Sequence, residues 1–330
     1  MNEALPSSEP KRIAVVGIGG VGGYFGGRLA RHYHPSNRQD GPVGEAEAVR
    51  VDFVARGEHL EAIRRRGLLL NTAEQTGMIC RPFQATDRIE ELDRPDICLV
   101  CVKGYDLDDI SRRLAPVVGP RTLVLPLLNG VDIRERIRER VSRALVLPAC
   151  VYVSASIVEP GVVTKHGGAG LLIYGQDPDH KEYRPDAIRK LFERAGIAVE
   201  YREDPYPAIW EKYLYIASFA LVTAWAGKPM GAVSAEKRLS DLTVRIMEEI
   251  QAIATQRGVR LEPGVVSTSL EKAKNLPYDT KTSYQRDVEK GGRNEGELFG
   301  ATIVRLGRES GVPTPVTERL NTAIEARLHS

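Results

Sequence analysis

A glycine-rich segment near the N-terminus constrains the fold of this chain more than any other feature. It follows the strand-like run Arg12–Val16, has the spacing Gly17-x-Gly19-x-x-Gly22, and leads into a helical pattern. In such a unit the first glycine permits a tight turn, the second lets the backbone approach a pyrophosphate, and the third lets helix and strand pack closely. The N–H groups at the start of the helix then face the anion. We therefore predict a dinucleotide-binding loop made of Gly17, Ile18, Gly19, Gly20, Val21 and Gly22.

The segment from residue 11 to residue 204 alternates strand-like runs with helical patterns. Strand-like runs cover Arg12–Val16, Val51–Ala55, Ile97–Val102, Thr122–Leu125 and Ala144–Val151. Helical patterns cover 21–33, 58–66, 107–114 and 131–141. Runs that are apolar almost throughout are typical of strands buried on both faces, and the alternation predicts a parallel sheet covered by helices. We predict an α/β, Rossmann-type domain over 11–204, with an irregular insertion at 34–48, more strands at 161–174, and a helix and closing strand over 185–201.

The pattern changes at the two prolines Pro205 and Pro207, which end the preceding strand. The segments that follow are helical, namely 209–225, 234–257, 265–274, 293–310 and 315–328. A domain boundary fits this change. We therefore predict an all-α C-terminal domain over 205–330 and, at the other end, a disordered polar tail over 1–10.

The residue after the second strand-like run indicates which nicotinamide cofactor is bound. An NAD-binding protein usually carries an acidic residue there for the ribose hydroxyls. In this chain the run is followed by Arg56, and we expect no carboxylate at this strand end to repel a phosphate. An arginine can bind a 2′-phosphate with two parallel hydrogen bonds, which favours NADP(H). The alternative is that Arg56 only ends the strand.

Composition excludes several classes of protein. The net charge is +2, which gives no strong field for nucleic acid. The most apolar stretch, 214–227, is shorter than the roughly 20 residues of a membrane span. The N-terminus has no apolar signal segment, and four cysteines in 330 residues make no disulfide framework. We expect a cytoplasmic protein that binds neither nucleic acid nor a membrane.

Cysteines and histidines give no metal site. Cys98 and Cys101 form a C-x-x-C spacing inside a strand-like run, where residues three apart point to opposite faces. His32 and His34 are close together but have no third ligand nearby. We therefore predict buried structural cysteines and no metal.

Four further segments, together with the glycine loop, resemble the ketopantoate reductase family. They are Val102-Lys103-Gly104-Tyr105, Leu128-Asn129-Gly130-Val131, Trp210-Glu211-Lys212 and the stretch from Ser283 to Glu295. The resemblance covers the chain from Lys11 onward, apart from 34–48. It implies a Rossmann domain and a helical, substrate-binding and catalytic domain that enclose NADPH and a 2-keto acid between them.

The resemblance also implies a role for each matching residue. Lys103 would lie near the adenosine end of NADPH, and Asn129 would contact the nicotinamide ribose and the substrate. Lys212 would protonate the carbonyl oxygen, Ser283 would hold the substrate carboxylate, and Glu295 would position Lys212 and a substrate hydroxyl. A lysine at this place suits the chemistry, because negative charge develops on the oxygen as hydride reaches carbon. The alternatives are a surface lysine beside Glu211, a helix N-cap at Ser283 and a helix-start carboxylate at Glu295.

One departure from the family concerns the substrate. The family carries asparagines four and eight residues after the catalytic lysine, whereas this chain has Ile216 and Ala220. Residues spaced by four share one helix face, so the wall beside Lys212 is predicted to be apolar. Reduction of 2-dehydropantoate to pantoate is the leading prediction, and reduction of another apolar 2-keto acid is the second.

Other functions stay open at this point. A paralogue could bind NADP(H) as a sensor without turnover, although it would not need Lys212 and Glu295. A methyltransferase shares the glycine loop but does not need Arg56. A β-hydroxyacid-type dehydrogenase fits the stretch from Ser283 to Glu295 less well. The sequence fixes neither the keto acid nor the oligomeric state, so a homodimer remains open.

Overall fold

The computed structural model describes residues 10–37 and 49–328. The predicted tail, apart from Pro10, and most of the predicted insertion lie outside the described residues. Contacts divide the chain into two compact units, the first formed by 1–128 and 132–205 and the second by 129–131 and 206–330. Each unit is described below by itself.

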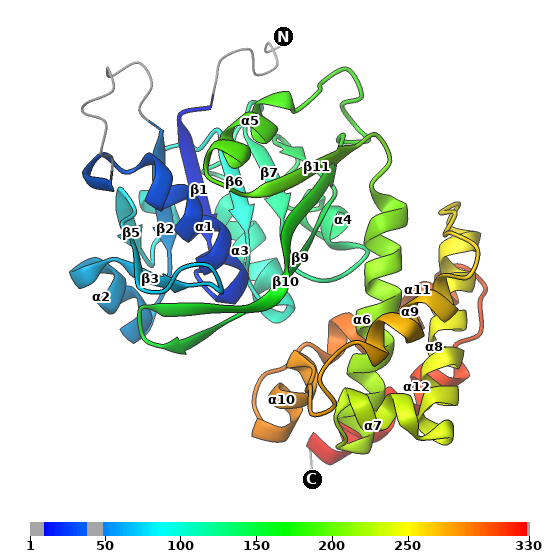
Figure 1. Cartoon of the computed structure of the whole chain (residues 1–330). Coiled ribbons are helices and arrows are strands. Elements are labelled where there is room, and N and C mark those ends of the chain that lie inside the picture. The colour runs from blue at the N-terminus through cyan, green and yellow to red at the C-terminus, as the bar shows by residue number, and fades with distance from the viewer. Residues whose placement is uncertain (1–9, 38–48, 329–330) are drawn as a thin grey trace. The chain divides into compact units, whose positions relative to one another are not determined.

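The first unit is built on a six-stranded sheet (Figure 1). The strand order is β5-β2-β1-β6-β7-β8, and every pairing in it is parallel. In chain order these strands are β1 (Arg12–Val16), β2 (Arg50–Val54), β5 (Gln84–Thr86), β6 (Ile97–Val100), β7 (Leu123–Pro126) and β8 (Leu145–Val146). This is the 3-2-1-4-5-6 order of the dinucleotide-binding fold, whose direction reverses between the first and fourth strands, here β1 and β6. The predicted Rossmann-type class is confirmed.

The register of the sheet aligns the carboxyl ends of its central strands. Val16, the last residue of β1, pairs with Val54 of β2 and with Val100 of β6, and Val100 pairs with Pro126 of β7. The residues that follow these strands therefore meet at one sheet edge. Ligands of open α/β sheets bind outside this edge, at the point where the strand order reverses.

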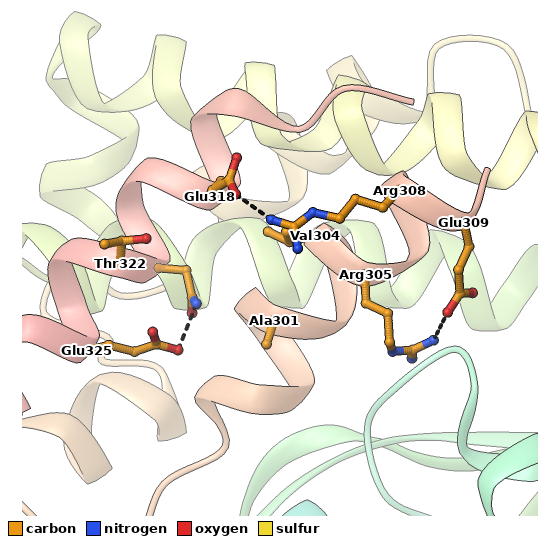
Figure 2. A pocket seen from close by; sticks show the side chains of 9 residues that line it. Ala301, Val304, Arg305, Arg308, Glu309, Glu318, Thr322 and Glu325 are labelled. Atoms are coloured by element: carbon orange, nitrogen blue, oxygen red, sulfur yellow. Dashed lines mark hydrogen bonds and ion pairs between the residues drawn. The ribbon is translucent and has the colours of Figure 1, made fainter. Parts of the chain in front are cut away.

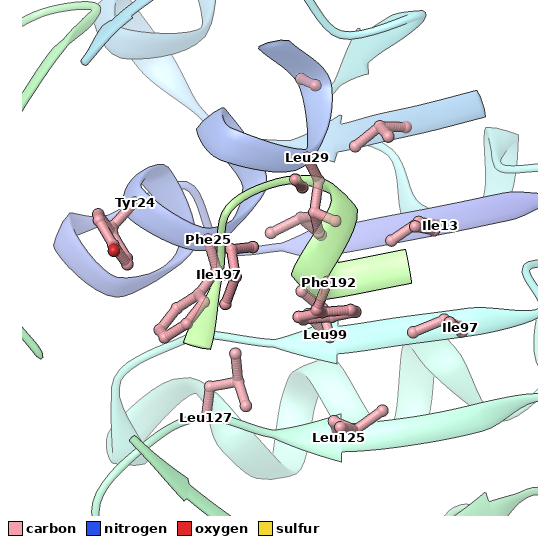
Figure 3. Packing of buried hydrophobic residues seen from close by; sticks show 14 of the residues in the cluster. Ile13, Tyr24, Phe25, Leu29, Ile97, Leu99, Leu125, Leu127, Phe192 and Ile197 are labelled. Carbon is pink, nitrogen blue, oxygen red and sulfur yellow. The ribbon is translucent and has the colours of Figure 1, made fainter. Parts of the chain in front are cut away.

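Helices bury the faces of this sheet. They are α1 (Gly20–Tyr33), α2 (Gly57–Arg66), α3 (Leu107–Leu114), α4 (Ile133–Arg138) and α5 (Asp186–Arg194). Figure 3 shows Phe25 and Leu29 of α1 and Phe192 of α5 in one buried cluster with Leu99 of β6. All four side chains are fully buried, so α1 packs on the face of the sheet and its start is held near the end of β1.

A second, five-stranded sheet in the first unit was only partly predicted. It consists of β3 (Leu68–Asn71), β4 (Met78–Cys80), β9 (Ala149–Glu159), β10 (Val162–Gly175) and β11 (Ala198–Arg202). The run 144–151 was predicted as one strand, which is wrong: β8 closes the first sheet and β9 begins the second. Pro148 lies at this break, where it has no N–H to continue a ladder.

The second unit is helical apart from its connecting loops (Figure 1). Its helices are α6 (Tyr206–Ala226), α7 (Met230–Ala235), α8 (Lys237–Gln256), α9 (Val265–Lys274), α10 (Ser283–Lys290), η5 (Glu297–Ala301), α11 (Thr302–Glu309) and α12 (Pro315–Leu328). The predicted helix at 234–257 is divided at Glu236, which has extended backbone angles. The one predicted at 293–310 begins four residues late and opens with a π-helical turn, η5. The predicted all-α class of this part is confirmed.

Helix α6 is the centre of the second unit. Its residues 217–224 are all buried, and it packs against α8, α10 and α12. Among the residues that the structure describes, no helix is both long enough and apolar enough to cross a membrane.

Candidate functional site

The glycine loop has the backbone geometry that its sequence predicts. Gly17 has a φ of +94°, which favours glycine, and its N–H and that of Ile18 both donate to the Val54 carbonyl of β2. A Cβ atom at Gly22 would lie 2.0 Å from the Gly17 carbonyl oxygen. The turn and the close packing of α1 therefore both require glycine.

The middle of the loop is open on one side and closed on the other. A Cβ atom at Gly19 would meet nothing within 4 Å, whereas one at Gly20 would lie 1.9 Å from the Ala155 carbonyl oxygen of β9. Gly20, Val21 and Gly22 form the first turn of α1, whose N–H groups have no acceptor within the helix itself. A diphosphate can thus approach the backbone at Gly19 and accept from the start of α1.

Arg56 is at the carboxyl end of β2, where it precedes the first turn of α2. Its side chain is 76% exposed, and its guanidinium donates to Asp106 Oδ2 at 3.0 Å. The sequence predicted that no carboxylate stands beside Arg56. That was wrong, because Asp106 comes from a segment 50 residues further along the chain.

Lys103 follows β6 at the same edge of the sheet. It is half-buried and precedes the short helical turn Gly104–Asp106, in which the Asp106 N–H donates to the Lys103 carbonyl at 2.9 Å. This turn presents Lys103 and Asp106 at the end of the strand that adjoins β1. The first unit therefore gathers the glycine loop, Arg56 and Lys103 around the edge where strand order reverses.

The C-x-x-C pair is structural. Cys98 lies within β6 and is buried, and burial raises the pKa of its thiol to about 12. Burial also raises the pKa of the Cys101 thiol, so both stay protonated at neutral pH. The Cβ of Cys101 is 3.0 Å from the position that a Cβ at Gly22 would take. Cys101 is thus a small side chain packed behind the glycine loop.

Lys212 and Asn129 contact each other within the second unit. Lys212 lies in the second turn of α6, and its Nζ donates to Asn129 Oδ1 at 2.9 Å across 83 residues of sequence. The Asn129 oxygen is the acceptor, since an ammonium can only donate. Both side chains are part-buried, and Gly130 next to Asn129 has a φ of +132°. The asparagine thereby gives the ammonium an acceptor from a distant part of the sequence.

Ser283 is the first residue of α10 and is exposed. It is not the helix N-cap: that position belongs to Thr282, whose Oγ1 accepts from the Gln285 N–H at 3.1 Å. The Thr282 hydroxyl also lies 2.9 Å from that of Thr223 on α6. The capping threonine fixes the start of α10 to α6 and leaves the Ser283 hydroxyl for another partner.

Glu295 lies between α10 and the π-helical turn η5 and is 5% exposed. Its carbonyl accepts from the Phe299 N–H at 3.1 Å, and Gly296 packs beside the Tyr284 hydroxyl. π-Helical turns often occur at functional sites, because they displace side chains from the regular helix face. The carboxylate is therefore held in the interior of the second unit rather than at a solvated helix start.

The face of α6 beyond Lys212 is aromatic and apolar. Ile216 is half-buried and Ala220 is 2% exposed, and the Tyr215 ring packs on Phe219 with centroids 5.3 Å apart. Burial raises the pKa of the Tyr215 phenol. Of the polar side chains deeper in this helix, Ser218 and Thr223 are bonded back to their own helix. Next to Lys212, this face therefore offers the half-buried Ile216 and the phenol of Tyr215, whereas Ala220 is buried.

Three residues near these positions were missed by sequence reasoning, namely Asp106, Thr282 and Tyr215. For Thr282 there was a signal, since Thr282-x-x-Gln285 has the spacing of a capping box. Tyr215 is one turn from Lys212, so the helical spacing could have found it. Nothing local indicates the contact between Asp106 and Arg56.

A hollow of about 400 Å³ in the second unit lies apart from these residues. It is lined by α11 and α12, and Figure 2 shows Arg308 paired with Glu318 and Arg305 paired with Glu309 inside it. None of the predicted site residues lines it. Both arginines are paired with glutamates, the third carboxylate of the lining, Glu325, accepts from Asn321, and we assign the hollow no ligand.

The whole chain is similar to proteins of one family. Residues 13–179 match the family model described as ketopantoate reductase PanE/ApbA, and residues 205–327 match the model of its C-terminal part. The chain belongs to the ketopantoate reductase family.

Relatives in this family are similar over nearly their full length. A 2-dehydropantoate 2-reductase from Mesorhizobium japonicum is 27% identical, with 93% of this chain and 94% of that protein covered. An uncharacterized oxidoreductase, YkpB, from Bacillus subtilis is 23% identical over 93% of this chain and 95% of its own. The crystal structure of a PanE/ApbA family ketopantoate reductase from Ralstonia eutropha JMP134 has a TM-score of 0.84 at 27% identity, covering 96% and 98% of the two chains. Membership of the ketopantoate reductase family makes this chain an oxidoreductase.

Proposed function

We propose that this protein uses NADPH to reduce a 2-keto acid to the 2-hydroxy acid, with 2-dehydropantoate as the first candidate substrate. The observation that carries the proposal is the bond between Lys212 Nζ and Asn129 Oδ1, 2.9 Å long. This bond gives the Lys212 ammonium a defined partner, and the chain belongs to a family of 2-keto acid reductases. Full-length relatives named 2-dehydropantoate 2-reductase support the substrate class.

The cofactor part of the proposal rests on the first unit. The open backbone at Gly19 and the first-turn N–H groups of α1 fit a diphosphate, and Arg56 fits a 2′-phosphate. Lys103, at the neighbouring strand end, adds a second cation for the adenosine end. Bound NADPH would supply the hydride that the carbonyl carbon accepts.

The second unit would supply the proton and hold the acid. Lys212 donates its ammonium proton to the carbonyl oxygen, which becomes the hydroxyl of the product, and the neutral amine then regains a proton from water. Asn129 keeps the ammonium in place and contacts the substrate. Ser283, whose hydroxyl is not used for capping, binds the carboxylate, and the buried Glu295 positions Lys212 and a substrate hydroxyl.

A second candidate substrate is favoured by one observation: the half-buried Ile216 lies one turn beyond Lys212 on α6, and the next residue of that face, Ala220, is buried. A substrate hydroxyl against Ile216 finds no amide partner. We therefore keep a branched 2-keto acid without the 4-hydroxyl, such as 2-oxoisovalerate, as the alternative.

Replacement of the proposed acid tests this function. General acid catalysis contributes on the order of 10²–10⁴ in rate, so Lys212→Ala should lower turnover by that factor and leave NADPH affinity near wild type. The matched control is Lys272→Ala, which removes an exposed lysine that is paired with Glu211 beside Lys212. Its turnover should stay within about twofold of wild type, because exposed pairs contribute little. A Lys212→Ala enzyme that keeps more than about a third of wild-type turnover, when chemistry limits the rate, would remove this role.

A further inference from the structure

The ion pair between Arg56 and Asp106 bears on which nicotinamide cofactor the first unit selects. Arg56 follows β2, at the strand end where this fold holds the adenosine ribose. Asp106 Oδ2 is 3.0 Å from its guanidinium. An anion at Arg56 therefore also meets the charge of Asp106.

The carboxylate is the fixed member of this pair. Its side chain is 17% exposed, whereas that of Arg56 is 76% exposed. Asp106 also occupies the N-cap position of α3 but makes no side-chain capping bond there. An N-cap aspartate usually accepts from the first turn of its own helix. Here the carboxylate is directed at Arg56 instead, so the arginine can move to meet a ligand while the carboxylate stays beside the site.

We propose that Asp106 restrains the preference for NADPH over NADH that Arg56 creates. This inference rests on the proposed use of NADP(H). A 2′-phosphate on Arg56 would lie roughly 6 Å from the Asp106 carboxylate, since each anion is about 3 Å from a guanidinium nitrogen. Like charges at that distance near a protein surface change an equilibrium constant by roughly 3- to 100-fold. The ribose of NADH carries a hydroxyl there, which can donate to a carboxylate.

Asp106→Asn separates the charge from the contact, because an asparagine oxygen still accepts from Arg56. The measurement is the Kd of NADPH and of NADH by titration calorimetry on the full-length protein. We expect the Kd for NADPH to fall by roughly 3- to 30-fold at low salt, while that for NADH stays constant or rises. Added salt should reduce the gain for NADPH, since screening weakens the repulsion.

Asp108→Asn is the matched control. It removes the same charge two residues away, from an exposed carboxylate that is paired with Arg112 and Arg140. The ratio of the two Kd values should change by less than about twofold in this variant, since its carboxylate faces other partners.

The outcomes separate this inference from the proposed function. Weaker NADPH binding in Asp106→Asn would mean that the carboxylate orients Arg56 for the phosphate, which overturns the inference. An equal gain for both cofactors, or an equal effect of Asp108→Asn, would also overturn it. A wild-type protein that binds neither nucleotide would instead remove the proposed cofactor use.

Discussion

The two units differ in the groups that we propose to bind ligands. In the first unit these are mainly backbone: the N–H groups at the start of α1 and the open main chain at Gly19. In the second they are side chains on or beside helices, namely Lys212, Ser283 and Glu295. Ligand binding by the first unit should therefore be lost when a loop residue becomes larger, since a Cβ at Gly22 has no room. Ligand binding by the second unit should be lost when a side chain changes its functional group.

The units also differ in how charge is buried. In the first, Arg134 of α4 pairs with the buried Asp177, which also accepts from the Val146 N–H at 3.1 Å. In the second, Glu249 of α8 accepts from the Val316 and Thr317 N–H groups at 2.8 and 3.0 Å. In the first unit an arginine neutralises the buried carboxylate. In the second unit the N–H groups at the start of α12 donate hydrogen bonds to the Glu249 carboxylate. The predictions below test both contrasts.

Removal of the buried arginine should have the largest effect on stability. Arg134→Ala removes the arginine partner of the buried Asp177, which keeps only the His180 ring and backbone N–H groups as partners, and breaking such a pair costs about 3–5 kcal/mol. Peptide-resolved hydrogen exchange should show the loss in the first unit, around α4 and β8, while α8 and α12 keep their protection. Arg138→Ala, which removes a more exposed partner of Asp179 and a donor to the Ala144 carbonyl, should cost less, about 1–2 kcal/mol. Equal effects of the two variants would contradict the account of this cluster.

The capping carboxylate of the second unit should rank next. Glu249→Ala removes the acceptor for two N–H groups and for the Thr317 hydroxyl, and should cost about 2–3 kcal/mol, seen as faster exchange in α12. Glu249→Gln keeps one acceptor oxygen and should lose about half as much. A glutamine variant as unstable as the alanine variant would mean that the charge of Glu249, rather than its hydrogen bonds, stabilises the start of α12.

The first unit also contributes one side chain, Arg56, which we propose selects the cofactor. Loss of one charge-assisted contact costs ~1.5–3 kcal/mol, or roughly 10- to 150-fold in affinity. Arg56→Ala should weaken NADPH binding by that factor and leave NADH little changed, as measured by fluorescence titration. Equal losses for both cofactors would show that Arg56 does not bind the 2′-phosphate.

Substrate selection tests the apolar face of α6. An unpaired buried hydroxyl costs about 1–3 kcal/mol, or roughly 5- to 150-fold, whereas each buried methylene contributes about 0.8 kcal/mol. If Ile216 and Ala220 contact the substrate, a keto acid without the 4-hydroxyl should lose little in kcat/KM relative to 2-dehydropantoate. A preference for 2-dehydropantoate above about 100-fold would show that Asn129, Ser283 and Glu295 satisfy the hydroxyl without this face.

The sequence predicted features that depend on residues close together in the chain, and missed those that depend on residues far apart in the chain. The glycine loop was predictable, because the demands on Gly17 and Gly22 arise within one strand–turn–helix unit. The fold class was predictable from the alternation of runs. The contact of Asp106 with Arg56 was not, because it depends on β2 and β6 both pairing with β1. The short strands β3 and β4 have too few residues for a period, and their place in the sheet depends on β3 pairing with β10 and β4 pairing with β3.

The helical unit shows the same limit. Lys212 and Asn129 were each predicted from the family resemblance, but their bond depends on how a loop after β7 packs against α6. The capping role of Thr282 has a local signal in its spacing to Gln285, but the contact of its hydroxyl with Thr223 on another helix has none. Such contacts are tertiary, so spacing along the chain does not contain them.

The central claim is that hydride from NADPH reaches the carbonyl carbon of a 2-keto acid on this protein. The most direct measurement is NADPH oxidation by the purified wild-type protein, followed at the nicotinamide absorbance, with 2-dehydropantoate and its 4-deoxy analogue as substrates and with the product identified as the 2-hydroxy acid. The account predicts stoichiometric oxidation of NADPH and formation of the hydroxy acid with at least one of the two. Tight binding of NADPH with no oxidation by either acid would contradict it and would favour a nucleotide-binding sensor.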